Sequence, residues 1–457
     1  METYIMKSKK CVYILLFSFS LASAQGLFES AEKNSETSLP AQTLASNVDL
    51  SGYVRGALFY GQNSGNDAEL KAAYADVSLK LNARKSNIGK AFGEVRLVSG
   101  TEYGSPHFSP DVREAWVSAT PGLFDITLGK KIIAWGRADG INPTNRITPM
   151  NSTAFSSELD DTRQGNFLAQ ASFSWFFLRF EGIWLPLYAP DVLPIGGADL
   201  PSGITITDPA YPGSAVENSG FAVRCDLSFP SVDGSLSYFN GYETQPGFNY
   251  TSGLSGFSLI PAAYRIHMAG VDFSTAIGPF GVRGEAAVVI PFDNPEKKPF
   301  IPSRHAAFVL GIDRSISSLN LLVQYAGVYV PDFRPIPQPV LRNPADIRAQ
   351  MEYLLALGEA EIISINRLFT QTADRASHSV TAHIGWRGLY ETLRIDLAGQ
   401  YNFTTEEYVI NPAIAYDIAD ALCVTVGGRY LRGPAGSRND LVDDMLSHVY
   451  AELKLSF

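Results

Sequence analysis

Residues 447–457, SHVYAELKLSF, indicate the fold class of this chain. From Val449 to Phe457 every second side chain is apolar, and polar or charged residues such as Glu452 and Lys454 stand between them. A period of two residues places alternate side chains on opposite faces of a β-strand. The chain therefore ends on a strand with one apolar and one polar face, and its last residue, an aromatic, belongs to the apolar face.

The same alternation recurs in residues 75–82, 221–228, 393–402 and 422–430. Alternation alone also fits a soluble sandwich, so the lengths of the connections must decide between the two folds. Short connections, one of them near 172–175, alternate with mostly longer ones, such as 101–109. This order predicts about 18 antiparallel strands, or 16 to 20 if one hairpin is misread, with both termini at the same rim.

We therefore predict an all-β fold, a transmembrane antiparallel β-barrel with short periplasmic turns and long outer loops. A charged content of 18% and a mean hydropathy of +0.01 suit a wall with one wet and one apolar face. No apolar run is long enough for a membrane-spanning helix, since the nearest, 173–188, contains Arg179, Glu181 and Pro186. A barrel of this size leaves an aqueous channel.

The two ends of the chain predict export and assembly. Residues 1–24 read as a signal peptide, with Lys7 to Lys10 before an apolar core and Ala22-Ser23-Ala24 before the cleavage point. Residues 25–47 read as a flexible periplasmic segment, which leaves 48–457 for the barrel. The terminal strand resembles the one that outer-membrane barrels present to the barrel-assembly machinery through Phe457. We expect a bacterial outer-membrane location and membrane lipid as a partner, as a monomer or homo-oligomer.

The stretch LGKKIIAWGRADGINPTNRITP, Leu128 to Pro149, opens the third outer loop, which we place at 133–164. Gly136 and Gly140 permit a sharp turn into the lumen. The alternative is an external loop closed by an Arg–Asp contact. If the loop folds inward, we expect its polar residues to face a solute at a pore constriction. The candidates are Lys131, Trp135, Arg137, Asp139, Asn142, Arg146, Asp160, Asp161 and Arg163.

Opposite charges stand two residues apart on several strands, and therefore on one face. Facing lipid they would be very costly, so we assign them to the lumen as a charge ladder. The ladder either keeps the wall wet and rigid or binds a polar or anionic solute. Its members are Glu94 and Arg96, Arg179 and Glu181, Arg224 and Asp226, Arg283 and Glu285, and Arg394 and Asp396, with Glu452 and Lys454 following the same pattern.

The longest outer loop, 331–375, contains a segment with helical spacing. Residues 344–358 begin with Pro344, carry apolar residues at helical intervals and end at Gly358, which predicts a short amphipathic helix.

The chain offers few residues for catalysis or metal binding. His378 and His383 are an odd number of residues apart, which places them on opposite faces of a strand, so they cannot share an ion. There is no glycine-rich phosphate loop, no CxxC motif and no basic run suited to nucleic acid. We therefore predict neither an enzyme nor a cofactor, a metal site or a nucleic-acid partner. Cys225 and Cys423 lie on different strand faces, so we expect no disulfide between them.

The segment REAWVSATPGLFDITLGKKIIAWGRADGINPTN, Arg113 to Asn145, resembles a family of bacterial outer-membrane barrels of unknown function. That family is related in architecture to alginate-export and other substrate-specific porins. Its motif is a strand that ends in a basic residue and enters a loop through Trp-Gly-x-x-Asp and Asn-Pro. The matching residues are Lys131, Trp135, Gly136, Asp139, Asn142 and Pro143. The family usually has Arg-Gln where this chain has Lys130-Lys131.

The resemblance implies a porin-like transporter without naming its solute. We expect passive or substrate-specific passage of small polar or anionic molecules. Two alternatives stay open at this point. One is an exporter or uptake barrel for an apolar or polymeric substrate, and the other is a surface adhesin or structural barrel without transport.

Overall fold

A single closed sheet forms the body of the molecule. The computed structural model describes residues 48–457 apart from 64, 66, 86–87, 194–203 and 254–255. The predicted signal peptide, 1–24, and the segment 25–47 lie outside the described residues. The sheet has 18 strands, in which each strand pairs with its neighbours along the chain, and the last strand, β21, pairs with the first, β1. The prediction of a closed antiparallel barrel of about 18 strands is confirmed.

The wall strands are β1 (Val48–Gln62), β2 (Ala68–Lys85), β3 (Gly89–Glu102), β4 (Ser105–Ala119), β5 (Phe124–Lys131), β6 (Asn166–Trp175), β7 (Leu178–Leu185), β9 (Gly220–Ser228), β10 (Val232–Tyr242), β13 (Arg265–Ile277), β14 (Phe280–Pro291), β15 (His305–Ile316), β16 (Leu319–Tyr329), β17 (Ala376–Gly388), β18 (Leu393–Asn402), β19 (Glu407–Ala419), β20 (Leu422–Arg432) and β21 (His448–Ser456). A small sheet of β8 (Ile204–Ile206), β11 (Gly247–Gly253) and β12 (Gly256–Ala262) lies in the outer loops. The described helices are η3 (Leu159–Thr162), η4 (Val216–Asn218), α3 (Ile347–Phe369) and α4 (Arg438–Leu446).

Side chains alternate between the lumen and the outside, as the last strand predicts. On β21, Leu453 is 48% exposed, whereas its neighbour Glu452 is buried. Large apolar side chains stand exposed on the outward face of the wall strands, for example Val54, Leu397 and Val426. An apolar surface of this extent is stable in hydrocarbon and not in water, so the strands span a membrane. Among the described residues, no helix is long and apolar enough to cross a membrane.

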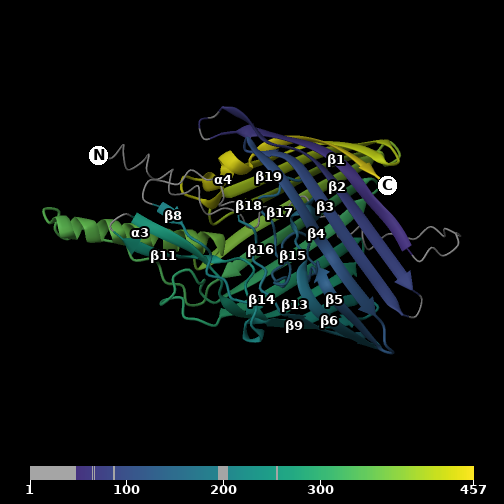
Figure 1. Cartoon of the computed structure of the whole chain (residues 1–457), viewed down its shortest axis with the longest axis horizontal. Coiled ribbons are helices and arrows are strands. Elements are labelled where there is room, and N and C mark those ends of the chain that lie inside the picture. Colours follow the sequence, from purple (N-terminus) through teal and green to yellow (C-terminus); the bar gives the residue numbers. More distant parts are fainter. Residues whose placement is uncertain (1–47, 64, 66, 86–87, 194–203, 254–255) are drawn as a thin grey trace.

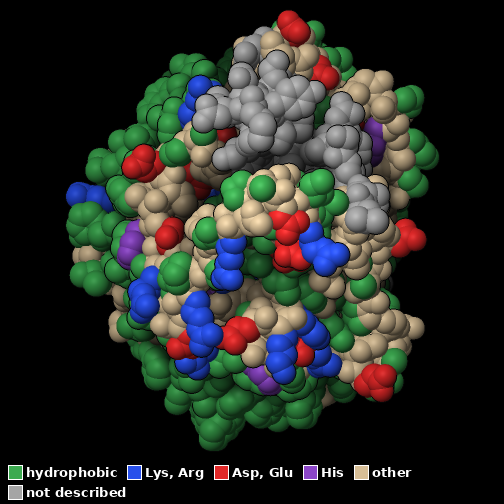
Figure 2. Space-filling view, turned by 90° about the vertical axis from the view of Figure 1, so that its left-hand side faces the viewer, with side chains coloured by type: hydrophobic (Ala, Val, Ile, Leu, Met, Phe, Trp, Pro, Cys, Tyr) green, Lys and Arg blue, Asp and Glu red, His purple; other side chains and the backbone are tan. Residues whose placement is uncertain are grey.

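The two rims differ. The C-terminus and the short turns lie at one end, and α3 with the small sheet lies at the other (Figure 1). Seen onto the loop end, Lys, Arg, Asp and Glu side chains gather across the middle of the face, while hydrophobic side chains cover the lower flank (Figure 2). The division into short turns at one rim and longer loops at the other follows from hairpins that alternate around a closed sheet.

The loop expected at 101–109 is a tight turn at Tyr103 and Gly104, because β3 and β4 continue to Glu102 and Ser105. Pro106 and Pro110 both lie within β4, although proline has no N–H to donate to a sheet. β5 pairs with β4 only from Ala115 to Ala119, so both prolines lie where β4 has no partner on that side. Proline is tolerated on such an edge. The turn expected near 172–175 lies at Phe176 and Phe177 instead.

The helix in the longest outer loop is longer than expected. α3 begins after Asp346, whose side chain accepts a hydrogen bond from the backbone N–H of Arg348, and runs through Gly358 to Phe369. A Cβ at Gly358 would lie 2.4 Å from the ring of Phe257 on β12. This glycine therefore permits close packing and does not end the helix. The sequence interpretation ended the helix here because glycine is common just after the last residue of a helix.

Replacement of Leu397 by Arg should destabilise the barrel. Leu397 lies near the middle of β18 and is 45% exposed on the outward face. A charge at the bilayer midplane costs about 2–4 kcal/mol, and this amount should appear as a loss of unfolding free energy in urea titrations in lipid vesicles. Leu397→Ile is the control and should change little. An equal stability of Leu397→Arg and the wild type would contradict the assignment of this face to lipid.

Candidate pore constriction

Residues 132–165, here called the inner loop, leave the end of β5 and return to β6. Gly136 and Gly140 have positive φ angles of 106° and 80°, which glycine adopts without strain. A Cβ at Gly136 would lie 2.4 Å from Oε1 of Glu285, a lumen-facing residue of β14. The loop backbone therefore reaches the wall on a strand distant from β5 and β6. It crosses the inside of the barrel.

The first part of the inner loop contacts β7 to β15. The indole N–H of Trp135 donates to Glu181 at 2.9 Å, and Trp135 is buried. Arg137 donates to Asp272 at 2.7 Å and lies 3.5 Å from Asp226. These contacts tie nearby residues of the loop to β7, β9 and β13. We call them the first anchor, which comprises Trp135, Arg137, Asp139 and Asn142.

Glu285 is the centre of the first anchor. Its carboxylate accepts hydrogen bonds from the backbone N–H of Ala138 at 2.6 Å and from the side chains of Asn142 and Thr144, both at 3.0 Å. Nearby, Asp139 accepts from Arg283 at 2.8 Å. Charge-assisted bonds of this kind are stronger than neutral ones, so the bend at 136–144 has a defined position.

The returning part of the inner loop contacts β1 to β4. Asp161 lies 2.6 Å from Arg55, 3.3 Å from Arg96 and 3.2 Å from Arg113. Arg55 has no exposed side-chain surface and also lies 2.7 Å from Asp76 and 3.3 Å from Glu452. We call this the second anchor. It comprises Asp160, Asp161 and Arg163 of the loop with these wall residues.

Local contacts order the second anchor. Arg113 donates to the backbone oxygen of Asp160, and the side chain of Asp160 accepts from Arg163 at 2.6 Å. Phe155 adds an apolar contact, with its ring centroid 5.3 Å from that of Phe59 and 5.6 Å from that of Tyr103. The phenol of Tyr74 donates to the backbone oxygen of Phe155 at 2.6 Å. The loop is therefore held by charge and by aromatic packing at the same place.

Of the two other constriction candidates, Lys131 is the last residue of β5 and Arg146 lies near the middle of the inner loop. The ammonium of Lys131 lies 4.9 Å from the ring centroid of Trp116 and donates to Gln170 at 3.0 Å. Arg146 lies 3.2 Å from Glu243, in the connection that follows β10. Arg146 therefore ties the inner loop to a second outer loop.

The two anchors differ in their electrostatics. Burial opposes ionisation of Asp161, but Arg55, Arg96 and Arg113 together outweigh it and hold the pKa of this carboxyl well below its usual range. Burial raises the pKa of Asp139 to about 6, against the opposing effect of Arg283. Asp161 therefore keeps its charge at any ordinary pH, whereas Asp139 in the first anchor takes up a proton near pH 6.

The charge ladder lies on the lumen face, and its members contact one another in different ways. Arg224 and Asp226 pair within their strand at 2.9 Å, and Arg179 and Glu181 do so at 3.8 Å. The others contact different strands or the inner loop. Arg96 pairs with Asp76, Glu94 lies 3.8 Å from Lys80 and Arg283 lies 3.0 Å from Asp313. Arg394 lies 3.0 Å from Asp417, Asp396 lies 3.1 Å from His383, Glu452 contacts Arg55, and Lys454 contacts Glu158.

The structure brings all nine constriction candidates to the inner loop and its base, but it changes their expected surroundings. We expected Asp139 and Asp161 to face a solute, and both are buried against the wall with arginine partners. The sequence interpretation missed the wall residues Arg55, Asp76 and Arg113. The sequence feature that could have identified them is a single charged residue at a strand position that faces the lumen. A search for charge pairs two residues apart does not detect single charges of this kind.

The class of protein that this fold and this interior define is the transmembrane β-barrel, a closed sheet with an apolar outer face and a charged lumen. Among solved structures, the chain is similar to OccK2 (OpdF) of Pseudomonas aeruginosa in complex with glucuronate. The TM-score is 0.53 at 8% identity, over 91% of this chain and 99% of that one. It is also similar to OccK9 (OpdG) of the same organism, with a TM-score of 0.52 at 10% identity over 90% and 98% of the chains. No family model and no curated protein matches the chain.

Removal of the guanidinium in Arg55→Met should release the second anchor. The variant leaves Asp76, Asp161 and Glu452 with less compensating positive charge. Removing one partner of a buried ion pair lowers the free energy of unfolding by about 3–5 kcal/mol. We expect a higher single-channel conductance in planar bilayers. The control is Arg432→Met, which removes an exposed pair with Asp443. Unchanged conductance of a folded Arg55→Met barrel would contradict the role of this anchor.

Ion selectivity should change near pH 6 because of Asp139. As the pH falls through this value, Asp139 takes up a proton while Arg283 keeps its charge, so the lumen gains positive charge. Anion permeability relative to cation permeability should therefore rise, measured as a shift in reversal potential across a salt gradient between pH 7 and pH 5. In Asp139→Asn this step should be absent. A step of equal size and midpoint in that variant would assign it to another group.

Proposed function

We propose that this chain forms an outer-membrane channel for passive or substrate-specific passage of small polar and anionic solutes, with the inner loop as its constriction. The proposal involves no bond chemistry. Support for a constriction comes from the inner loop, which is anchored on β7 to β15 and again on β1 to β4. A segment held on two separate parts of the wall narrows the space between them.

The observation that carries the preference for anions is the strand register, which places like charges opposite each other at two positions on the lumen face. Arg84 on β2 is directly opposite Lys90 on β3, and Arg387 on β17 is directly opposite Arg394 on β18. Like charges directly opposite each other on neighbouring strands destabilise a sheet. All four residues lie close to the short turns, and therefore at the periplasmic end of the lumen.

The two opposed pairs differ in their surroundings. Arg394 contacts Asp417, whereas among the described residues no carboxylate lies within ion-pair distance of Arg84 or Lys90. Cations without a carboxylate partner raise the local concentration of anions in a narrow passage. The similarity to a barrel in complex with glucuronate agrees with a small carboxylate as the kind of solute to test first.

The charged lumen argues against an apolar substrate. A surface role receives some support from α3, which projects from the loop end with Ile347 and Leu354 exposed. Steady open-channel conductance separates transport from a binding role without transport. Recognition of Phe457 by the barrel-assembly machinery, and a monomeric or homo-oligomeric state, stay predictions.

Permeation into proteoliposomes tests the proposed solute class. The protein should admit glucuronate faster than glucose, a neutral sugar of similar size. Removing both unpaired charges in Arg84→Gln/Lys90→Gln should reduce glucuronate entry about fivefold, the effect of roughly 1 kcal/mol of electrostatic attraction in a wet channel, and leave glucose entry unchanged. Lys298→Gln, in an exposed outer loop, is the control. Equal entry of both sugars through the wild type would contradict a preference for anions.

A further inference from the structure

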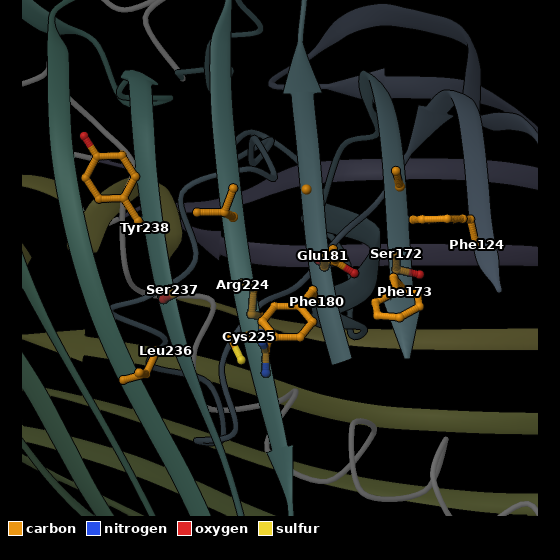
Figure 3. A pocket seen from close by; sticks show the side chains of 13 residues that line it. Phe124, Ser172, Phe173, Phe180, Glu181, Arg224, Cys225, Leu236, Ser237 and Tyr238 are labelled. Carbon is orange, nitrogen blue, oxygen red and sulfur yellow. The ribbon is translucent and has the colours of Figure 1, made fainter. Parts of the chain in front are cut away.

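A groove of about 550 Å³ lies on the barrel where β5, β6, β7, β9 and β10 run side by side (Figure 3). Phe124, Phe173 and Phe180 line one part of it, and Leu236 and Tyr238 line another. Between them the wall carries the small residues Ala171, Gly182 and Cys225. A Cβ at Gly182 would meet no atom within 4 Å, so the space above this residue is open.

The groove belongs to the lipid side of the wall. Phe124, Phe180, Val223 and Leu236 are 44–57% exposed, and they alternate with lumen residues such as Glu181 and Arg224. The outward-facing side chains of the lining include no charged residue. The chemistry of this lining fits hydrocarbon.

The position of the groove selects one leaflet. Phe124 is the first residue of β5, and Phe173 and Phe180 lie three residues before and after the turn at Phe176 and Phe177. These residues are therefore close to the periplasmic rim. β5 and β7 have only eight residues each, against 18 in β2. Eight residues reach roughly 20 Å at a tilt of about 40°, less than the hydrocarbon thickness, so lipid must adapt to the wall here.

The rim below the groove carries four exposed aromatic side chains. Trp175, Phe176, Phe177 and Phe229 are 55%, 88%, 48% and 49% exposed. Phe176 has a φ of 53°, in the left-handed region where a two-residue hairpin turn favours Asn or Gly. The aromatic ring is thus kept at a cost in backbone strain. Aromatic rings anchor proteins at the glycerol and headgroup level of a membrane.

We propose that this groove binds one acyl chain of a phospholipid of the periplasmic leaflet, with the aromatic rim contacting the same lipid at its glycerol level. The acyl chain lies against Gly182 and Cys225, between the phenylalanine rings and Leu236. The site is independent of solute passage, because it faces away from the lumen. It makes this arc of the wall the place where a specific lipid stays bound while the surrounding lipids exchange.

Native mass spectrometry tests the site on the full protein taken from vesicles of phosphatidylethanolamine and phosphatidylglycerol. We expect one phospholipid to stay bound to the wild type. Gly182→Leu fills open space in the groove and should lower this occupancy about tenfold, since several methylene contacts are lost. Gly56→Leu is the matched control, because Gly56 faces outward on β1 with nothing within 4 Å, and it should retain the lipid.

Three outcomes would overturn the proposal. The first is equal phospholipid occupancy in Gly182→Leu and the wild type. Both proteins must be folded, as shown by a change in their migration in gel electrophoresis after heating. The second is a dimer that forms without lipid and is lost in Gly182→Leu, which would assign the groove to a second copy of the chain. The third is displacement of the bound phospholipid by added lipopolysaccharide, which would assign it to the outer leaflet.

Discussion

The structure depends on the requirement that every backbone polar group inside a membrane has a hydrogen-bond partner. Lipid supplies none, so the sheet must close on itself. The closing contact joins the two ends of the described chain. Gly52 donates to the backbone oxygen of Phe457 at 2.9 Å, and Phe457 donates back at 3.0 Å. Because the closed sheet has no free edge along this seam, every wall strand has one face toward lipid and one toward the lumen. This division decides where charges are tolerated.

The lumen holds charges that the outer face could not. Arg55, Asp76 and Asp161 lie together with almost no exposed side-chain surface, and they neutralise one another across β1, β2 and the inner loop. A single buried charge there would be costly, whereas in a connected set the opposite charges and their hydrogen bonds offset the cost of desolvation. The inner loop completes the set, because Asp161 lies among three arginines of the wall. The same contacts that satisfy the wall therefore position the loop, so wall stability and pore shape have a common cause.

The alternation of side chains made most of the wall predictable. The two faces of the strands and the lumen position of Arg224 and Asp226 follow from a period of two residues, and the strand number follows from the order of short and long connections. The errors have specific physical causes. Pro106 lies in a strand because β5 is too short to pair with that part of β4. Gly358 lies inside α3 because the ring of Phe257 packs against it. In both cases a local preference was overruled by a neighbour distant in the sequence.

The sequence by itself determined the barrel, its approximate strand number and the lumen face of the charges that stand two residues apart. These features depend on spacing along one chain segment, and spacing is visible without coordinates. Only the tertiary structure decided that Asp161 contacts Arg55, Arg96 and Arg113, that Glu285 holds the bend at Gly136, and that the groove beside Gly182 is open. These contacts join residues that are tens to hundreds of positions apart. The closure of the sheet and the course of the inner loop bring these residues together. A pattern within one short segment of the sequence cannot indicate such a contact.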